Sequence, residues 1–182
     1  MCKVGYWRYD PSVRTSVFSF PNPVNDVAAR TVATGVVVMA VAAIVLRQPW
    51  LTIPLAYGFV ARVASGPRFS PLGLLATRVV APRLSKWEKL VPGPPKRFAQ
   101  GMGAAFTLTA LSLWLAGVTT AAYVVLGLLV VPATLEGALG LCVGCKIFAL
   151  GMRIGLVPES VCEECNDIWG AAAQARRAAT SV

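Results

Sequence analysis

Four of the five cysteines in the chain form two pairs, each with two residues between its members. Cys142 and Cys145 make the first pair, Cys162 and Cys165 make the second, and 16 residues separate the two pairs. This spacing is typical of zinc sites built from four thiolates, because zinc accepts soft ligands tetrahedrally. In a reducing cytosol such pairs otherwise serve catalysis or redox sensing. The pairs therefore predict thiol, disulfide or persulfide chemistry, or a zinc site, and cysteines that only pack are the third interpretation.

The two pairs differ in the charges around them. Lys146 directly follows Cys145, and a nearby cation lowers the pKa of a thiol and favours the reactive thiolate. The second pair lies among four of the chain's eight acids, which oppose thiolate formation but attract metal cations. The predicted catalytic residues are Cys142, Cys145 and Lys146. The predicted ligands of a zinc ion, the cofactor that the spacing of the pairs indicates, are Cys142, Cys145, Cys162 and Cys165.

The chain contains no histidine. This excludes catalysis by imidazole, haem ligation by histidine and every zinc site that uses a histidine ligand. Glu136, six residues before Cys142, ends an apolar segment and is an ionisable residue of the kind that marks functional sites in membranes. We expect it to be a carboxylate at the membrane interface that pairs with Lys146 or Arg97, in preference to a catalytic group.

The segments that must position these cysteines are strongly apolar. Of 182 residues, 56% are hydrophobic and 14% are charged, whereas a soluble domain carries roughly 25% charged residues. A helix that crosses a bilayer needs about 20 apolar residues. Four segments approach this length: 27–46, 49–64, 98–116 and 119–135. The sequence therefore predicts an all-α, polytopic membrane protein with four transmembrane helices in two hairpins.

The basic residues predict the orientation of these helices. The formal net charge is +9, and among the hairpin turns only the first contains a basic residue, Arg47. Under the positive-inside rule both termini and the central loop are cytoplasmic, and the lipid bilayer accounts for the charge without nucleic acid. The predicted divisions are a cytoplasmic N-terminal segment (1–26), a first hairpin (27–64), a basic cytoplasmic loop (65–97), a second hairpin (98–137) and a cytoplasmic tail with both cysteine pairs (138–182).

The central loop has a pattern of its own. Apolar and basic residues alternate through 71–90, which is typical of a basic amphipathic segment at the membrane interface, and Pro82 is expected to break it in two. The simplest interpretation is a charged loop that sets topology. The other interpretation is a site for lipid headgroups or an anionic substrate at Arg68, Arg78 and Arg83.

Four segments, taken in order, resemble a family of small bacterial integral membrane proteins, common in actinobacteria and described only as a domain of unknown function. They are FPNPVNDVAAR at 20–30, GPRFSPLGLL at 66–75, PPKRFAQ at 94–100 and LCVGCK at 141–146. The resemblance covers about residues 20–170 and implies four membrane helices and a CxGC motif after the fourth. Cys142 and Cys145 take the cysteine positions of that motif, whereas Cys162 and Cys165 are an addition that many relatives lack.

The resemblance also implies a bacterial plasma membrane and an association with thioredoxin-like or sulfurtransferase proteins. Two hypotheses about function follow. In the first, Cys142 and Cys145 exchange thiols or sulfur with a cytosolic partner, while Lys146 and Arg153 stabilise the thiolate. In the second, the protein is a non-enzymatic membrane subunit whose four thiolates bind structural zinc. A transporter has little support, because the polar residues of the spans are chiefly hydroxyls.

Overall fold

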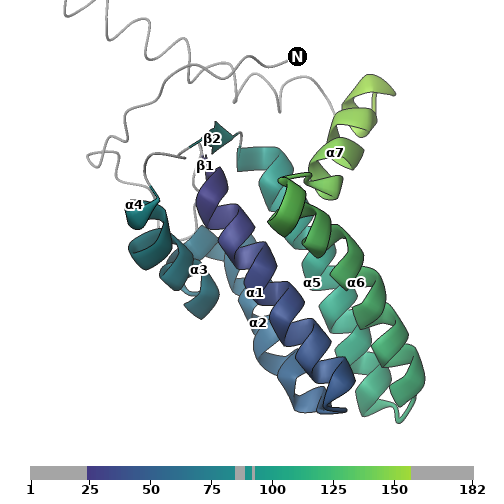
Figure 1. The fold of residues 1–182 in the computed structure, drawn as a ribbon. Helices are drawn as coiled ribbons and strands as arrows, with labels where there is room; N and C mark the ends of the chain where they lie inside the picture. The colour runs from purple at the N-terminus through teal and green to yellow at the C-terminus, as the bar shows by residue number, and fades with distance from the viewer. Residues whose placement is uncertain (1–23, 85–88, 92, 157–182) are drawn as a thin grey trace, which may run out of the picture.

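The computed structural model describes residues 24–84, 89–91 and 93–156 (Figure 1). Its main elements are four helices that lie side by side as a bundle: α1 (Asp26–Val45), α2 (Thr52–Ser65), α5 (Gly93–Leu115) and α6 (Thr119–Leu139). The predicted all-helical fold class is confirmed for the described part of the chain. Cys2, Cys162 and Cys165 lie outside the described residues.

Shorter elements join and extend the bundle. Two strands, β1 (Val24–Asn25) and β2 (Leu90–Val91), pair antiparallel, with Val24 opposite Val91. The short turn η1 (Pro49–Leu51) precedes α2, and the central connection contains η2 (Gly66–Arg68), α3 (Pro71–Leu75), η3 (Ala76–Val80) and α4 (Ala81–Arg83). Helix α7 (Val143–Arg153) follows α6 and projects from the end of the bundle (Figure 1).

Three of the four bundle helices are long and apolar enough to cross a membrane, namely α1, α5 and α6. Their outward faces carry large apolar side chains, such as Val38, Leu108 and Leu128, which a soluble bundle would not leave exposed. The chain is therefore a membrane protein by the character of its helices. The fourth predicted span, 49–64, is a different case, because α2 has only 14 residues and spans about 21 Å of a roughly 30 Å hydrocarbon layer.

Local chemistry explains where the long helices begin and end. The side chain of Asn25 caps α1 by accepting hydrogen bonds from the backbone N–H of Val27 (2.9 Å) and Ala28 (3.3 Å). Helix α5 begins at Gly93, five residues before the predicted start at 98, because proline is tolerated in a first turn, where N–H groups have no helical partner. Helix α6 ends at the left-handed residue Gly140, where φ is 68°.

Small residues allow the bundle helices to approach each other closely. Ala40, Ala43 and Ala110 are fully buried where helices cross. A Cβ added at Gly103 of α5 would lie 2.1 Å from the ring of Phe59 on α2, a separation that real atoms do not adopt. This is the packing mode of membrane bundles, in which association depends on close backbone approach.

The central connection is helical without interruption from residue 71 to residue 83. The expected break at Pro82 is absent. A π turn over Ala76–Val80 ends two residues before the proline, and its last hydrogen bond runs from Ala81 N–H to the carbonyl of Ala76. The wider turn occupies the place where a regular α-helix would meet the proline ring.

Candidate thiol site

The first cysteine pair lies at the N-terminus of α7. Cys142 is the N-cap residue, with an extended backbone (φ −80°, ψ 103°), and its Sγ accepts a hydrogen bond of 3.3 Å from the backbone N–H of Cys145. Cys145 follows in the first turn of the helix. The N-terminus of a helix carries a partial positive charge that stabilises a thiolate.

The two thiols differ in acidity. A hydrogen bond from the Cys145 side chain to the Cys142 sulfur lowers the pKa of Cys142, although burial opposes this effect. The same hydrogen bond, together with burial, raises the pKa of Cys145. Cys142 is therefore the member that becomes the thiolate, and Cys145 is the member that keeps its proton.

Acidity and exposure favour different members of the pair. Cys142 is 8% exposed, whereas Cys145 is half-buried, and both are free thiols. Since the thiolate is the nucleophile, acidity decides which sulfur attacks first. Exposure then makes Cys145 the easier sulfur for a bulky partner to reach.

A buried cation acts on both thiols, and sequence reasoning did not identify it. Lys96, in the first turn of α5, is 5% exposed, and its charge lowers the pKa of both Cys142 and Cys145. Lys146, the cation predicted from its place in the sequence, lies exposed on the first turn of α7. Its position at the edge of a long apolar helix is the feature of the sequence that could have identified Lys96.

Lys96 is the centre of an ion-pair cluster from three helices. Its Nζ donates a hydrogen bond of 2.6 Å to Oε1 of Glu136 on α6 and lies 3.4 Å from Oδ1 of Asp26 on α1. Glu136 thus pairs with Lys96, not with Lys146 or Arg97 as expected. The cluster is close to the first turn of α7, because Glu136 lines the same cavity as Val143 and Gly144. The charge of Glu136 raises the pKa of each cysteine.

A second buried cation lies beside this cluster. Arg62 of α2 is 4% exposed, and its guanidinium donates hydrogen bonds to the side chains of Ser70 and Gln100, both at 2.8 Å. Its charged group also lies 4.5 Å from the centre of the Phe59 ring. Ser70 in turn caps α3 by accepting from the N–H of Gly73. Arg62 therefore fixes the GPRFSP segment to the bundle.

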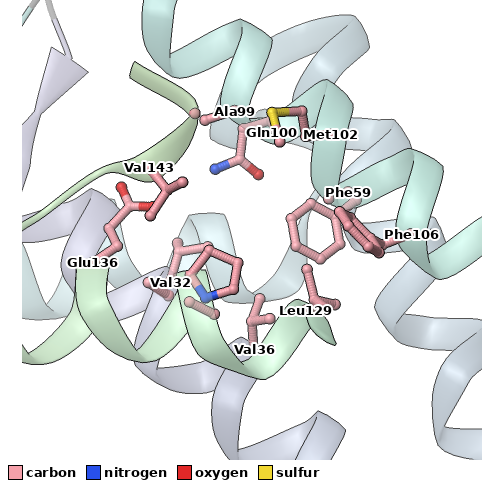
Figure 2. A pocket seen from close by; sticks show the side chains of 15 residues that line it. Val32, Val36, Phe59, Ala99, Gln100, Met102, Phe106, Leu129, Glu136 and Val143 are labelled. Atoms are coloured by element: carbon pink, nitrogen blue, oxygen red, sulfur yellow. The ribbon is translucent and has the colours of Figure 1, made fainter. Parts of the chain in front are cut away.

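A cavity of about 60 Å³ lies between the bundle helices and the first turn of α7 (Figure 2). Most of its wall is apolar, and Figure 2 shows Gln100 and Glu136 as the labelled side chains with polar groups around it. Val143 and Gly144, between the two cysteines, also line it. A cavity of this size has room for a few water molecules, and Gln100 and Glu136 offer them polar groups.

The predicted zinc site is not assembled within the described ranges, because they contain no group of three or more histidine, cysteine or acidic residues that could hold a metal ion. Two of its four predicted ligands, Cys162 and Cys165, lie outside those ranges. Zinc binding therefore stays a prediction from spacing.

A family model described as Domain of unknown function (DUF4395) matches residues 24–153 of the chain. The match includes all four bundle helices and α7, and therefore the first cysteine pair and both buried cations. Comparisons with curated proteins and with solved structures give no match.

Proposed function

We propose a function from the site itself, since the chain belongs to a family described only as a Domain of unknown function (DUF4395). The protein is a membrane-embedded thiol-exchange protein whose reactive pair is Cys142 and Cys145. One observation carries this proposal: Cys142 caps α7, and its Sγ accepts a hydrogen bond of 3.3 Å from the backbone N–H of Cys145. That arrangement stabilises one thiolate and keeps the second thiol beside it.

The reaction proceeds by two displacements. The Cys142 thiolate attacks one sulfur of a partner disulfide, forms a mixed disulfide and releases the other partner sulfur as a thiolate. Cys145 then gives its proton to the released partner thiolate and attacks the Cys142 sulfur, which releases the second partner sulfur as a thiolate. The products are a Cys142–Cys145 disulfide and a reduced partner, so two electrons move from the pair to the partner.

The same thiolate can accept sulfur. Attack by Cys142 on the outer sulfur of a partner persulfide transfers that atom, makes a persulfide on Cys142 and leaves the partner as a thiolate. The partner class for either reaction is a thioredoxin-like protein or a sulfurtransferase in the cytosol. We place the pair at the cytoplasmic face of a bacterial plasma membrane, with both termini on the same side, because the basic residues favour that orientation.

Trapping of a mixed disulfide tests the proposal. Full-length Cys145→Ser protein in detergent, mixed with an oxidised thioredoxin-like protein, is expected to form a covalent complex through Cys142 that dithiothreitol releases. The matched control, Cys145→Ser with Cys142→Ser, is expected to form none. An equal yield of complex from both variants contradicts the proposal, because the remaining cysteines would then be responsible.

Elemental analysis of the same preparation separates thiol exchange from zinc binding. Free thiols without metal are the expected result. About one zinc per chain, lost in Cys162→Ala, would instead support the four-thiolate site and overturn the assignment of the first pair as a redox pair.

A further inference from the structure

Helix α7 exposes a row of large apolar side chains, which we call the apolar row. Ile147 and Leu150 of α7 and its C-cap residue Ile154 are three and four residues apart, so they share one face of the helix. These side chains are 43%, 57% and 62% exposed. Soluble proteins seldom leave large apolar side chains next to one another in water, so such a surface indicates contact with lipid or with protein.

A basic row borders the apolar row. It consists of Lys146 and Arg153, each of which directly precedes one of the isoleucines and is exposed. The two cations lie about two helical turns apart, and α7 contains no acidic residue. An apolar face beside a basic one is typical of helices that lie at a membrane surface, where the cations meet anionic headgroups.

The opposite side of α7 packs against the start of α5. A Cβ added at Gly144 would lie 2.6 Å from Cβ of Ala99, and the rings of Phe148 and Phe98 have centroids 5.6 Å apart. Helix α5 has 23 residues and spans about 34 Å, slightly more than the roughly 30 Å hydrocarbon layer, so its first turns lie near the bilayer surface. Helix α7 is therefore held at the level of that surface, where α5 begins and α6 ends (Figure 1).

The exposed apolar surface also continues along the chain from a membrane-crossing helix into α7. Leu139, the last residue of α6, is exposed, and so is Leu141 in the connection that follows. The side chains that precede the apolar row thus have the same character as the outward face of α6. This continuity and the basic border favour lipid over protein as the occupant of the row.

We propose that α7 is an interfacial helix that binds the bilayer surface. Ile147 and Leu150 enter the boundary between headgroups and acyl chains, and Ile154, at the outer end of the projecting helix, lies at headgroup level. Lys146 and Arg153 bind the phosphate groups of anionic lipids. This surface does not depend on the proposed thiol exchange. One consequence does rest on that function: a partner of the cysteine pair, in the first turn of α7, approaches along the membrane surface.

Spin labelling in vesicles tests this surface. In full-length protein with its native cysteines replaced by serine, which can still cap α7 at position 142, a nitroxide is attached at Leu150→Cys. The vesicles contain phosphatidylcholine and phosphatidylglycerol. Collisions of the nitroxide with oxygen, which is enriched in lipid, are compared with collisions with a water-soluble nickel chelate. We expect high oxygen and low nickel accessibility, as for Leu128→Cys on the outward face of α6.

Three further labels complete the comparison. Arg47→Cys, in the hairpin turn at the other end of the bundle, provides the aqueous reference with high nickel accessibility. Ile154→Cys is expected to lie between the lipid and aqueous references. Ile147→Cys gives a second measurement on the apolar row, so the result does not depend on replacing Leu150.

The basic row is tested separately with the label at Leu150→Cys. Vesicles of phosphatidylcholine alone remove the anionic headgroups, and Lys146→Gln with Arg153→Gln removes the cations. Each change is expected to raise nickel accessibility, because α7 loses its electrostatic attraction to the surface. Unchanged accessibility in both experiments would overturn the role of the two cations.

Two results would overturn the proposal for the apolar row. Nickel accessibility at Ile147→Cys and Leu150→Cys equal to that of Arg47→Cys would place the row in water. Low accessibility to both reagents would show that protein covers it, either a second copy or another part of the chain. These variants lack both thiols of the proposed reactive pair and meet no partner protein, so the outcome is independent of mixed-disulfide trapping.

Discussion

At the scale of single residues, one hydrogen-bond arrangement separates the roles of two chemically identical side chains. Cys142 Sγ accepts from the backbone N–H of Cys145 at 3.3 Å and also accepts from the Cys145 thiol. A sulfur that accepts hydrogen bonds is stabilised as a thiolate, and a sulfur that donates is stabilised as a thiol. The position of each cysteine relative to the start of α7 therefore decides which one reacts.

The pH dependence of Cys142 reactivity follows from this arrangement. Because the folded-state pKa of Cys142 is lowered, its alkylation rate should reach half of its maximum at a lower pH than that of an ordinary thiol does. Cys145→Ala removes the thiol donor, so we expect the midpoint to move to higher pH. Cys2→Ala, which removes a thiol distant from Cys142 in the sequence, provides the matched control. A midpoint that does not move in Cys145→Ala would contradict the role of this hydrogen bond.

At the scale of elements, helix crossings depend on glycines with no room for a side chain. Gly103 lies against Phe59, whereas a Cβ added at Gly101, two residues earlier on α5, would meet no atom within 4 Å. Phe59 also lines the cavity and lies beside the Arg62 guanidinium. The crossing of α2 and α5 therefore determines how the bundle core and its buried cation fit together.

Alanine at these two glycines should have opposite consequences. Gly103→Ala forces the Phe59 ring to move and is expected to destabilise the protein by about 1–3 kcal/mol. Gly101→Ala is expected to be neutral or slightly stabilising, by about 0.5–1 kcal/mol, because alanine favours a helix. Thermal unfolding of both variants in detergent, followed by tryptophan fluorescence, compares them. Equal loss of stability in both would contradict the close crossing.

At the scale of the whole molecule, the ion-pair cluster and a pair of tryptophans lie at opposite ends of the bundle. The ion pairs of Asp26, Lys96 and Glu136 bring the start of α1, the start of α5 and the end of α6 together. At the other end, the rings of Trp50 and Trp114 meet edge to face, with centroids 4.9 Å apart. Tryptophan favours the membrane interface, so this separation is consistent with a bundle that crosses a bilayer.

Labelling in intact cells tests the proposed orientation. In a chain whose native cysteines are replaced by serine, single cysteines are placed by Arg47→Cys, Val118→Cys and Ile154→Cys. A membrane-impermeant maleimide is expected to label the first two, in the hairpin turns, and to label Ile154→Cys only after the cells are opened. Labelling of Ile154→Cys in intact cells would show that the orientation is the reverse of the proposed one. Protection of Arg47→Cys alone would indicate that α1 or α2 does not cross.

The sequence by itself determined the properties that depend on composition and near neighbours. In lipid, the backbone N–H and C=O groups of a long uncharged segment find hydrogen-bond partners when the segment is a helix. The apolar helices were therefore predictable, and so was the position of the CxxC pair after the last of them. The length of α2 was less predictable, because the apolar segment 49–64 includes the short turn η1 before the helix begins at Thr52. Two prolines near the helix start, Pro49 and Pro54, made the first residue of α2 difficult to predict.

Only the tertiary structure decided which charges surround the thiols. Lys96 meets Asp26 and Glu136 from positions 70 and 40 residues away in the chain, and no local pattern encodes such a meeting. Lys146 is adjacent to Cys145 in sequence, yet it lies exposed, because the start of α7 sets its direction. Sequence proximity therefore indicated the wrong neighbour for Glu136, since the partner of a side chain in a bundle depends on how the helices cross.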